Sequence, residues 1–235
     1  MSAELSSKQT PDITTYFYTK KFTCPVCEKV FDVQVVRESK LRVVNVDTDF
    51  LSRYKDIDPN HYEVLYCTNC GYAALTTHFQ NVTEKQQMAL AKGLKETYKP
   101  IDFVFPYSLD DVIMRYEKAL ECADLLKVKE SQRAFILLRL AWVLRVAGVR
   151  SELESDCIKK AFEGLKSAYS TERFPIGNMD ESTAKYMIAD LARRSGQMGE
   201  AMRWCADVVV ARGISPSIKD RAIRLKDLIR EGKTD

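Results

Sequence analysis

Two short cysteine motifs contain the residues best suited to chemistry. The chain reads CPVCEKVF from residue 24 and CTNCGYAA from residue 67. The four cysteines concerned are Cys24, Cys27, Cys67 and Cys70. A Cys-x-x-Cys turn directs two sulfurs at one ion, and Zn²⁺ in structural sites prefers a tetrahedron of such ligands. We therefore predict one structural zinc site, in which strand pairing brings the two turns together.

The residues beside the cysteines support this prediction. Pro25 stiffens the first turn because its ring fixes φ, and Gly71 can adopt a positive φ directly after the second turn. A β-like run, VFDVQVV, follows the first pair, and another, HYEVLY, precedes the second. This layout is typical of a zinc ribbon. A β module of about 65 residues has a thin core, and zinc binding of about 10–16 kcal/mol can fold it.

Other roles for the four cysteines remain as alternatives. A thioredoxin-type redox pair needs a βαβ unit, which the pattern does not show, an iron–sulfur cluster uses the same ligands, and unrelated cysteines can be buried by chance. A catalytic zinc ion keeps an open position and commonly has histidine ligands. The two histidines, His61 and His78, are expected at the surface or as outer neighbours of the site. We therefore predict a structural rather than a catalytic ion.

Three further cysteines and two tryptophans are expected to pack in the helical part. Cys122, Cys157 and Cys205 lie on apolar stripes of predicted helices, where a buried free thiol is the usual state. Trp142 and Trp204 lie on similar stripes.

The spacing of apolar residues divides the chain into a β part and a helical part. VFDVQVV, LRVVNV and HYEVLY are β-rich, whereas helical periodicity begins after Asn81. Capping boxes at Thr83 and Ser108, an aspartate at position 180 and the Ser215-Pro216 pair predict helix starts. The predicted fold is α+β: a flexible leader (1–15), a zinc-ribbon-like β module (16–82), a helix and proline-containing connection (83–107) and an all-α domain (108–235).

A weak repeat indicates how the helices pair. LRLAWVLRVAG (138–148) and YMIADLARRSG (186–196) both place an alanine seven positions before a closing glycine. Small residues at this position allow close helix packing. The pattern predicts tetratricopeptide-like helical hairpins, with an irregular helical bundle as the alternative.

Charged clusters offer two further candidate surfaces. Asp47, Asp49, Asp56 and Asp58 share one loop with Arg53 and Lys55, which we interpret as a solvated loop rather than a Mg²⁺ or Ca²⁺ site. Its neighbouring aromatics could instead form a docking edge. Basic residues occur at Lys20, Lys21, Lys40 and Arg42, and in the last helix at Lys219, Arg221, Arg224, Lys226 and Arg230. They make nucleic-acid binding an alternative function, although the last helix also carries acidic residues.

Composition narrows the class of protein. The chain has 235 residues and a formal net charge of +3, too balanced to indicate a nucleic-acid partner by itself. We find no signal peptide, no membrane-spanning run and no phosphate loop, nucleophile elbow or His-Glu-x-x-His motif. Seven cysteines, four of them in close pairs, favour a reducing cytoplasmic compartment over a disulfide framework. We expect no enzymatic activity.

Several runs resemble one protein family. F-x-CPVC-x-x-x-F, DTDFLSRYKDIDPNHYEV and C-x-x-CGYAA, with GNMDESTAKYMIADLARRSGQMGEAMRWCADVV further on, are similar to an uncharacterised bacterial family catalogued as domain of unknown function 2225. The resemblance implies a bacterial cytoplasmic protein with paired cysteines and tetratricopeptide-like helices, and no activity. The sequence thus favours a non-catalytic zinc-binding protein that binds another protein, with a nucleic-acid-associated ribbon or a thiol-based redox sensor as alternatives.

Overall fold

The computed structural model describes residues 13–234, so most of the predicted leader lies outside the described residues. The strands are β1 (Phe17–Thr23), β2 (Val30–Val36), β3 (Val43–Val46), β4 (Ser52–Tyr54), β5 (Val64–Tyr66) and β6 (Ala73–Leu75). Short 3-10 helices span Ile13–Tyr16, Glu38–Lys40 and Pro59–Tyr62. The helices are α1 (Glu84–Thr97), α2 (Leu109–Leu126), α3 (Glu130–Ala147), α4 (Ser151–Thr171), α5 (Glu181–Arg194), α6 (Met198–Val210) and α7 (Pro216–Arg230). The predicted α+β class is confirmed.

The described strands form three separate antiparallel hairpins, β1–β2, β3–β4 and β5–β6. Each cysteine pair lies in the turn of its own hairpin, so the prediction that strand pairing joins the two turns is wrong. VFDVQVV forms β2 over its whole length as predicted, whereas LRVVNV and HYEVLY give strands that are shorter than expected. The Asp58 carboxylate accepts a hydrogen bond from the Asn60 amide at 2.9 Å and starts a 3-10 helix. His61 lies in this helix rather than on a strand.

Local capping signals predict most helix starts correctly. The capping boxes at Thr83 and Ser108 both form, Asp180 caps α5, and Pro216 is the first residue of α7. The start of α3 depends on a distant residue instead. Glu172 accepts hydrogen bonds from the Ser131 amide and hydroxyl at 2.9 and 2.7 Å.

The buried stripe of α1 differs from the sequence prediction. Helical spacing from Thr83 onward predicts an apolar stripe of Met88, Ala91, Leu94 and Tyr98, but Met88 is 73% exposed, whereas Leu90 and Leu94 are buried. These two leucines are four residues apart and so lie on the same face of the helix.

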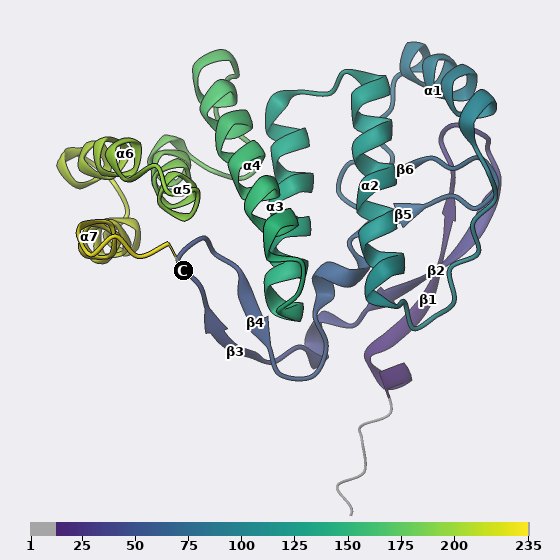
Figure 1. Cartoon of the computed structure of the whole chain (residues 1–235). Helices are drawn as coiled ribbons and strands as arrows, with labels where there is room; N and C mark the ends of the chain where they lie inside the picture. The colour runs from purple at the N-terminus through teal and green to yellow at the C-terminus, as the bar shows by residue number, and fades with distance from the viewer. Residues whose placement is uncertain (1–12, 235) are drawn as a thin grey trace, which may run out of the picture.

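The helices extend away from the β hairpins in chain order (Figure 1). α2, α3 and α4 lie side by side, and α5, α6 and α7 follow at the end farthest from β1 and β2. The β3–β4 hairpin departs from this order, because it reaches beneath α3 and α4 toward the C-terminus. Consecutive helices pack against one another from α3 to α7. Their tetratricopeptide-like character remains a prediction. None of the described helices combines the length and apolar character needed to cross a membrane.

One continuous core joins the β hairpins to the helices. Arg115 of α2 donates to the Val64 carbonyl of β5, and the Tyr116 hydroxyl donates to the Asn60 carbonyl at 2.7 Å. The segment between α1 and α2 contributes to the same contact, since the Arg115 guanidinium lies 4.0 Å from the centre of the Tyr107 ring. Helix α2 therefore fixes the position of the hairpin that carries Cys67 and Cys70.

Candidate metal centre

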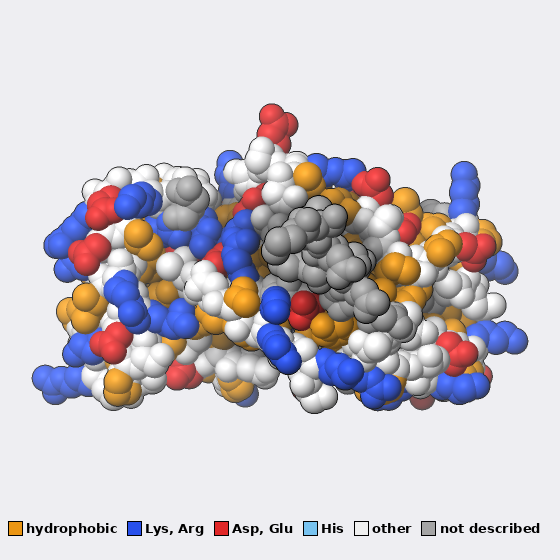
Figure 2. All heavy atoms as spheres, turned by 90° about the horizontal axis from the view of Figure 1, so that it is seen from below, with side chains coloured by type: hydrophobic (Ala, Val, Ile, Leu, Met, Phe, Trp, Pro, Cys, Tyr) orange, Lys and Arg blue, Asp and Glu red, His pale blue; other side chains and the backbone are white. Residues whose placement is uncertain are grey.

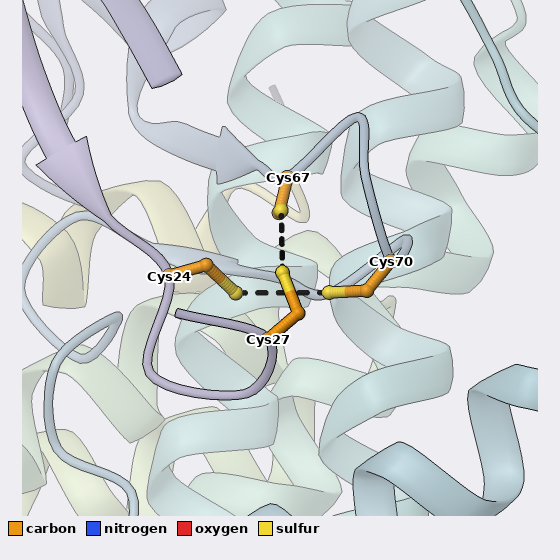
Figure 3. A group of neighbouring side chains, drawn as sticks. All are labelled: Cys24, Cys27, Cys67 and Cys70. Carbon is orange, nitrogen blue, oxygen red and sulfur yellow. Dashed lines mark hydrogen bonds between the residues drawn. The ribbon is translucent and has the colours of Figure 1, made fainter. Parts of the chain in front are cut away.

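The four predicted cysteines converge on one point (Figure 3). Cys24 and Cys27 come from the β1–β2 turn, and Cys67 and Cys70 come from the β5–β6 turn. Their sulfurs all lie within 4.8 Å of one another. The Cys24–Cys70 and Cys27–Cys67 sulfur pairs are each 3.6 Å apart. Tertiary folding thus brings together two local pairs that are 40 or more residues apart.

The two cysteine turns have the same backbone geometry. In each turn, the residue after the second cysteine donates to the carbonyl of the first: Glu28 to Cys24 at 2.9 Å, and Gly71 to Cys67 at 2.8 Å. Both donors have a positive φ, 59° at Glu28 and 80° at Gly71. This left-handed residue turns the chain sharply, which leaves both sulfurs of a pair on the same side of the turn. The positive φ predicted at Gly71 is confirmed.

The two turns differ in what packs against them. A Cβ atom at Gly71 would fall on the ring of Tyr98, the residue that follows α1. The Tyr98 hydroxyl donates to the carbonyl of Thr68 inside the same turn. Glycine at position 71 therefore serves both its positive φ and the close approach of Tyr98.

The sulfur positions fit a tetrahedral ion. A regular ZnS₄ tetrahedron with bonds of about 2.3 Å has sulfur–sulfur edges of about 3.8 Å, close to the two 3.6 Å separations. A disulfide would need about 2.05 Å, and all seven cysteines are free thiols. Four cysteines are also the donor set of a closed structural zinc site. The four residues can hold a metal ion, and their chemistry fits Zn²⁺.

Contacts within the tetrad separate the acidities of its thiols. Hydrogen bonds from Cys24 and Cys70, helped by backbone amides, lower the pKa of Cys67. The contact with Cys67 raises the pKa of Cys24, and the contact with Cys24 raises that of Cys70. Close sulfurs cannot all carry a negative charge without a cation, because each thiolate disfavours ionisation of the next. A divalent ion would remove this conflict.

A comparison with known protein families agrees with the motifs. A family model described as an uncharacterized protein conserved in bacteria, DUF2225, matches residues 17–233. The chain belongs to this family. No curated protein and no solved structure matches the chain. The matched segment of this DUF2225 protein includes both cysteine turns and all seven described helices.

The remaining cysteines and the histidines take other roles. Cys122, Cys157 and Cys205 are buried as predicted, and burial raises their pKa values to about 11, 12 and 11. Among the described residues, the candidate metal group contains the four cysteines without His61 or His78. Burial lowers the pKa of both histidines, which favours their neutral form.

The structure also corrects the interpretation of the acidic loop, at Asp49. Asp49 is fully buried, whereas a solvated loop was expected. The Trp142 indole donates to its Oδ2 at 2.9 Å, and the Arg145 guanidinium donates to both carboxylate oxygens at 2.9 and 3.1 Å. Arg194 lies 3.5 Å from Asp49. Phe50, one of the aromatics considered for a docking edge, packs against Tyr186.

These contacts form an Asp49 network that joins the β3–β4 hairpin to helices α3 and α5. Its members are Asp47, Thr48, Asp49, Trp142, Arg145, Asp190, Arg193 and Arg194. Asp190 and Arg193 are also fully buried and pair with each other at 2.8 Å. The helical spacing of Asp190 with Arg193 and Arg194 is a sequence signal for local pairing. No sequence signal places Asp49 beside them.

Proposed function

We propose that the protein is a non-catalytic, zinc-binding scaffold that binds another protein in the cytoplasm. The observation that carries the proposal is the set of four converging cysteine sulfurs, since four protein ligands close the coordination sphere of a structural ion. When bound, Zn²⁺ would neutralise the thiolates and cross-link the two turns. Because each turn belongs to its own hairpin, this cross-link would hold the β1–β2 and β5–β6 hairpins in a fixed relative orientation.

The attachment of the metal centre to the helices supports a scaffold role. The Cys122 sulfur of α2 accepts a hydrogen bond from the Ala73 amide at 3.4 Å, directly after the second cysteine turn. Arg139 of α3 forms an ion pair with Glu63, just before β5. A metal-stabilised β region that is held this firmly against a row of helices presents a rigid surface. Rigid surfaces lose less conformational entropy when a partner binds.

Nucleic-acid binding is the second candidate. Exposed basic side chains outnumber exposed acidic ones between residues 17 and 56, as expected for an electrostatic footprint. The last helix supports nucleic-acid binding less well, because two of its arginines already contact other side chains of the protein. Arg221 lies over the Phe50 ring at 4.9 Å, and Arg230 lies 3.7 Å from Asp227.

Two measurements on the full chain test the proposal. Elemental analysis of the purified protein is expected to find one zinc ion per chain, and no stoichiometric metal would overturn the zinc assignment. Affinity capture from the native cell is then run with and without nuclease. We expect a protein partner that remains after nuclease treatment. Loss of all partners after that treatment would favour nucleic acid and contradict the scaffold function.

A further inference from the structure

The three β hairpins surround a groove that is separate from the cysteine turns. It encloses about 600 Å³, and each of the six strands contributes a side chain to its wall. The apolar part of the wall includes Phe22, Val33, Val35, Val43, Leu65 and Leu75. Lys20, Glu63 and Arg139 are among its polar residues. This size, with a mostly apolar lining and a few polar groups, is typical of a ligand site.

An unpaired strand edge lies at the mouth of this groove. Among the described strands, β3 pairs with β4 alone. Val43, Val44 and Val46 of β3 are 52%, 63% and 40% exposed, and Val43 also lines the groove. Proteins usually protect such edges with charged residues or proline. An exposed valine-rich edge instead offers free backbone donors and acceptors to another extended chain.

The exposed surface of the segment that forms β1 to β4 carries more basic than acidic side chains, while the groove wall itself is balanced, with Lys20 and Arg139 against Glu38 and Glu63. Between residues 17 and 56 the exposed charged side chains are Lys20, Lys21, Lys29, Arg37, Lys40, Arg42 and Lys55 against Glu28, Asp32, Glu38 and Asp56. Figure 2 views the molecule from below, the side on which β3 and β4 lie in Figure 1, and shows Lys and Arg side chains with hydrophobic and some acidic side chains between them. Complementary charge favours an acidic partner.

These three observations together select one kind of occupant. A strand edge requires another polypeptide backbone, which neither a nucleic acid nor a small apolar molecule provides. A second copy of this chain would bring the same basic residues, such as Lys40 and Arg42, against themselves, and like charges oppose such pairing. An extended partner segment satisfies the backbone, and its alternate side chains can point into the groove.

We propose that an extended segment of a partner protein, with acidic and hydrophobic residues in alternation, adds to the β3 edge and fills this groove. The inference rests on the proposed scaffold function and gives that function a binding site. Hydrogen bonds to the β3 backbone would supply register. The apolar wall would select the hydrophobic side chains, and exposed basic residues beside β3, such as Lys40, Arg42 and Lys55, would select the acidic ones.

A randomised peptide library displayed on phage, selected on the zinc-loaded full chain, tests the proposal. We expect enriched peptides in which hydrophobic residues alternate with Asp or Glu. One such peptide, synthesised with a fluorophore, is then titrated against wild type, Val43→Glu and Val44→Glu. Each variant places a negative charge on the exposed edge and is expected to weaken binding about tenfold or more. Val210→Glu, at a 77% exposed valine of α6, is the matched control and is expected to bind normally.

The possible outcomes separate this site from the wider function. Equal binding by Val43→Glu, Val44→Glu and Val210→Glu would overturn the groove assignment while leaving a protein-binding role intact. Light scattering that shows a dimer in the wild type and a monomer in Val43→Glu would identify the edge as a self-interface. This result would also overturn the assignment of the groove to a partner segment. Failure of the scaffold function itself has a different signature, the nuclease-sensitive capture described above. Circular dichroism and zinc content confirm that each variant is folded.

Discussion

The cysteine tetrad and the Asp49 network both connect distant segments of the chain, but they use opposite chemistry. In the tetrad, four side chains of one type surround a point where a cation fits. In the network, Asp49 is balanced by Arg145 and Arg194, so charges of opposite sign neutralise each other without an ion. The tetrad fixes the β1–β2 and β5–β6 hairpins, whereas the network fixes the β3–β4 hairpin. Together they position all three hairpins that surround the groove.

The two clusters also differ in whether their contribution to folding depends on metal in the solution. A zinc site needs deprotonated ligands and free metal, so its contribution to folding disappears with a chelator. The Asp49 network needs only the fold itself. Removing one member of a buried charged set leaves its partners with less compensating charge in a medium of low polarity.

The largest expected effect tests the tetrad. Cys67→Ser removes a fully buried ligand, and we expect loss of stoichiometric zinc together with unfolding of the β hairpins, since zinc binding contributes about 10–16 kcal/mol in small zinc domains. Elemental analysis and circular dichroism measure both. Cys157→Ser makes the same chemical change at a buried helical cysteine and is expected to retain the metal. A Cys67→Ser protein that keeps its zinc and its β structure would show that the tetrad neither binds the metal through Cys67 nor stabilises the hairpins through it.

A smaller effect tests the network. Asp49→Asn leaves Arg145 and Arg194 without their shared carboxylate. We expect the free energy of unfolding to fall by about 3–5 kcal/mol, as for other broken buried ion pairs, with the zinc content unchanged. Urea denaturation measures the change. The control is Asp32→Asn on the exposed face of β2, expected to change the free energy by less than about 0.5 kcal/mol. Equal stability of the two variants would contradict the structural role of Asp49.

The smallest effect tests the packing of Tyr98 against the second cysteine turn. Gly71→Ala and Gly148→Ala both place a Cβ on a residue with positive φ, but only the alanine at 71 meets Tyr98. Gly148→Ala is expected to cost about 1–2 kcal/mol from backbone strain. Gly71→Ala is expected to cost about 1–3 kcal/mol more, because the Tyr98 ring must move. Thermal denaturation compares them, and equal losses would show that Tyr98 adapts freely.

Sequence reasoning succeeded where the relevant interaction is local. Two cysteines in one turn can be recognised as a ligand pair from their spacing alone, and Thr83 with Gln86 can be recognised as a capping box. It failed where a distant side chain decides the outcome. In the first turn of α3, Ser131 donates to Glu172, 41 residues further along the chain, and Asp49 is buried against Arg145, 96 residues further along. Residue types around Asp49 indicate only a polar loop.

The amino-acid sequence by itself determined which four cysteines form the candidate metal centre, the α+β class and most helix starts. Each of these depends on residues a few positions apart, whose relative placement the backbone geometry restricts. Only the tertiary structure decided that the three hairpins remain separate, that Asp49 of the acidic loop is buried and that β3 keeps an open edge beside a mostly apolar groove. The physical reason is that burial of a charge or a strand edge depends on which distant surfaces meet it, and spacing along the chain does not specify them.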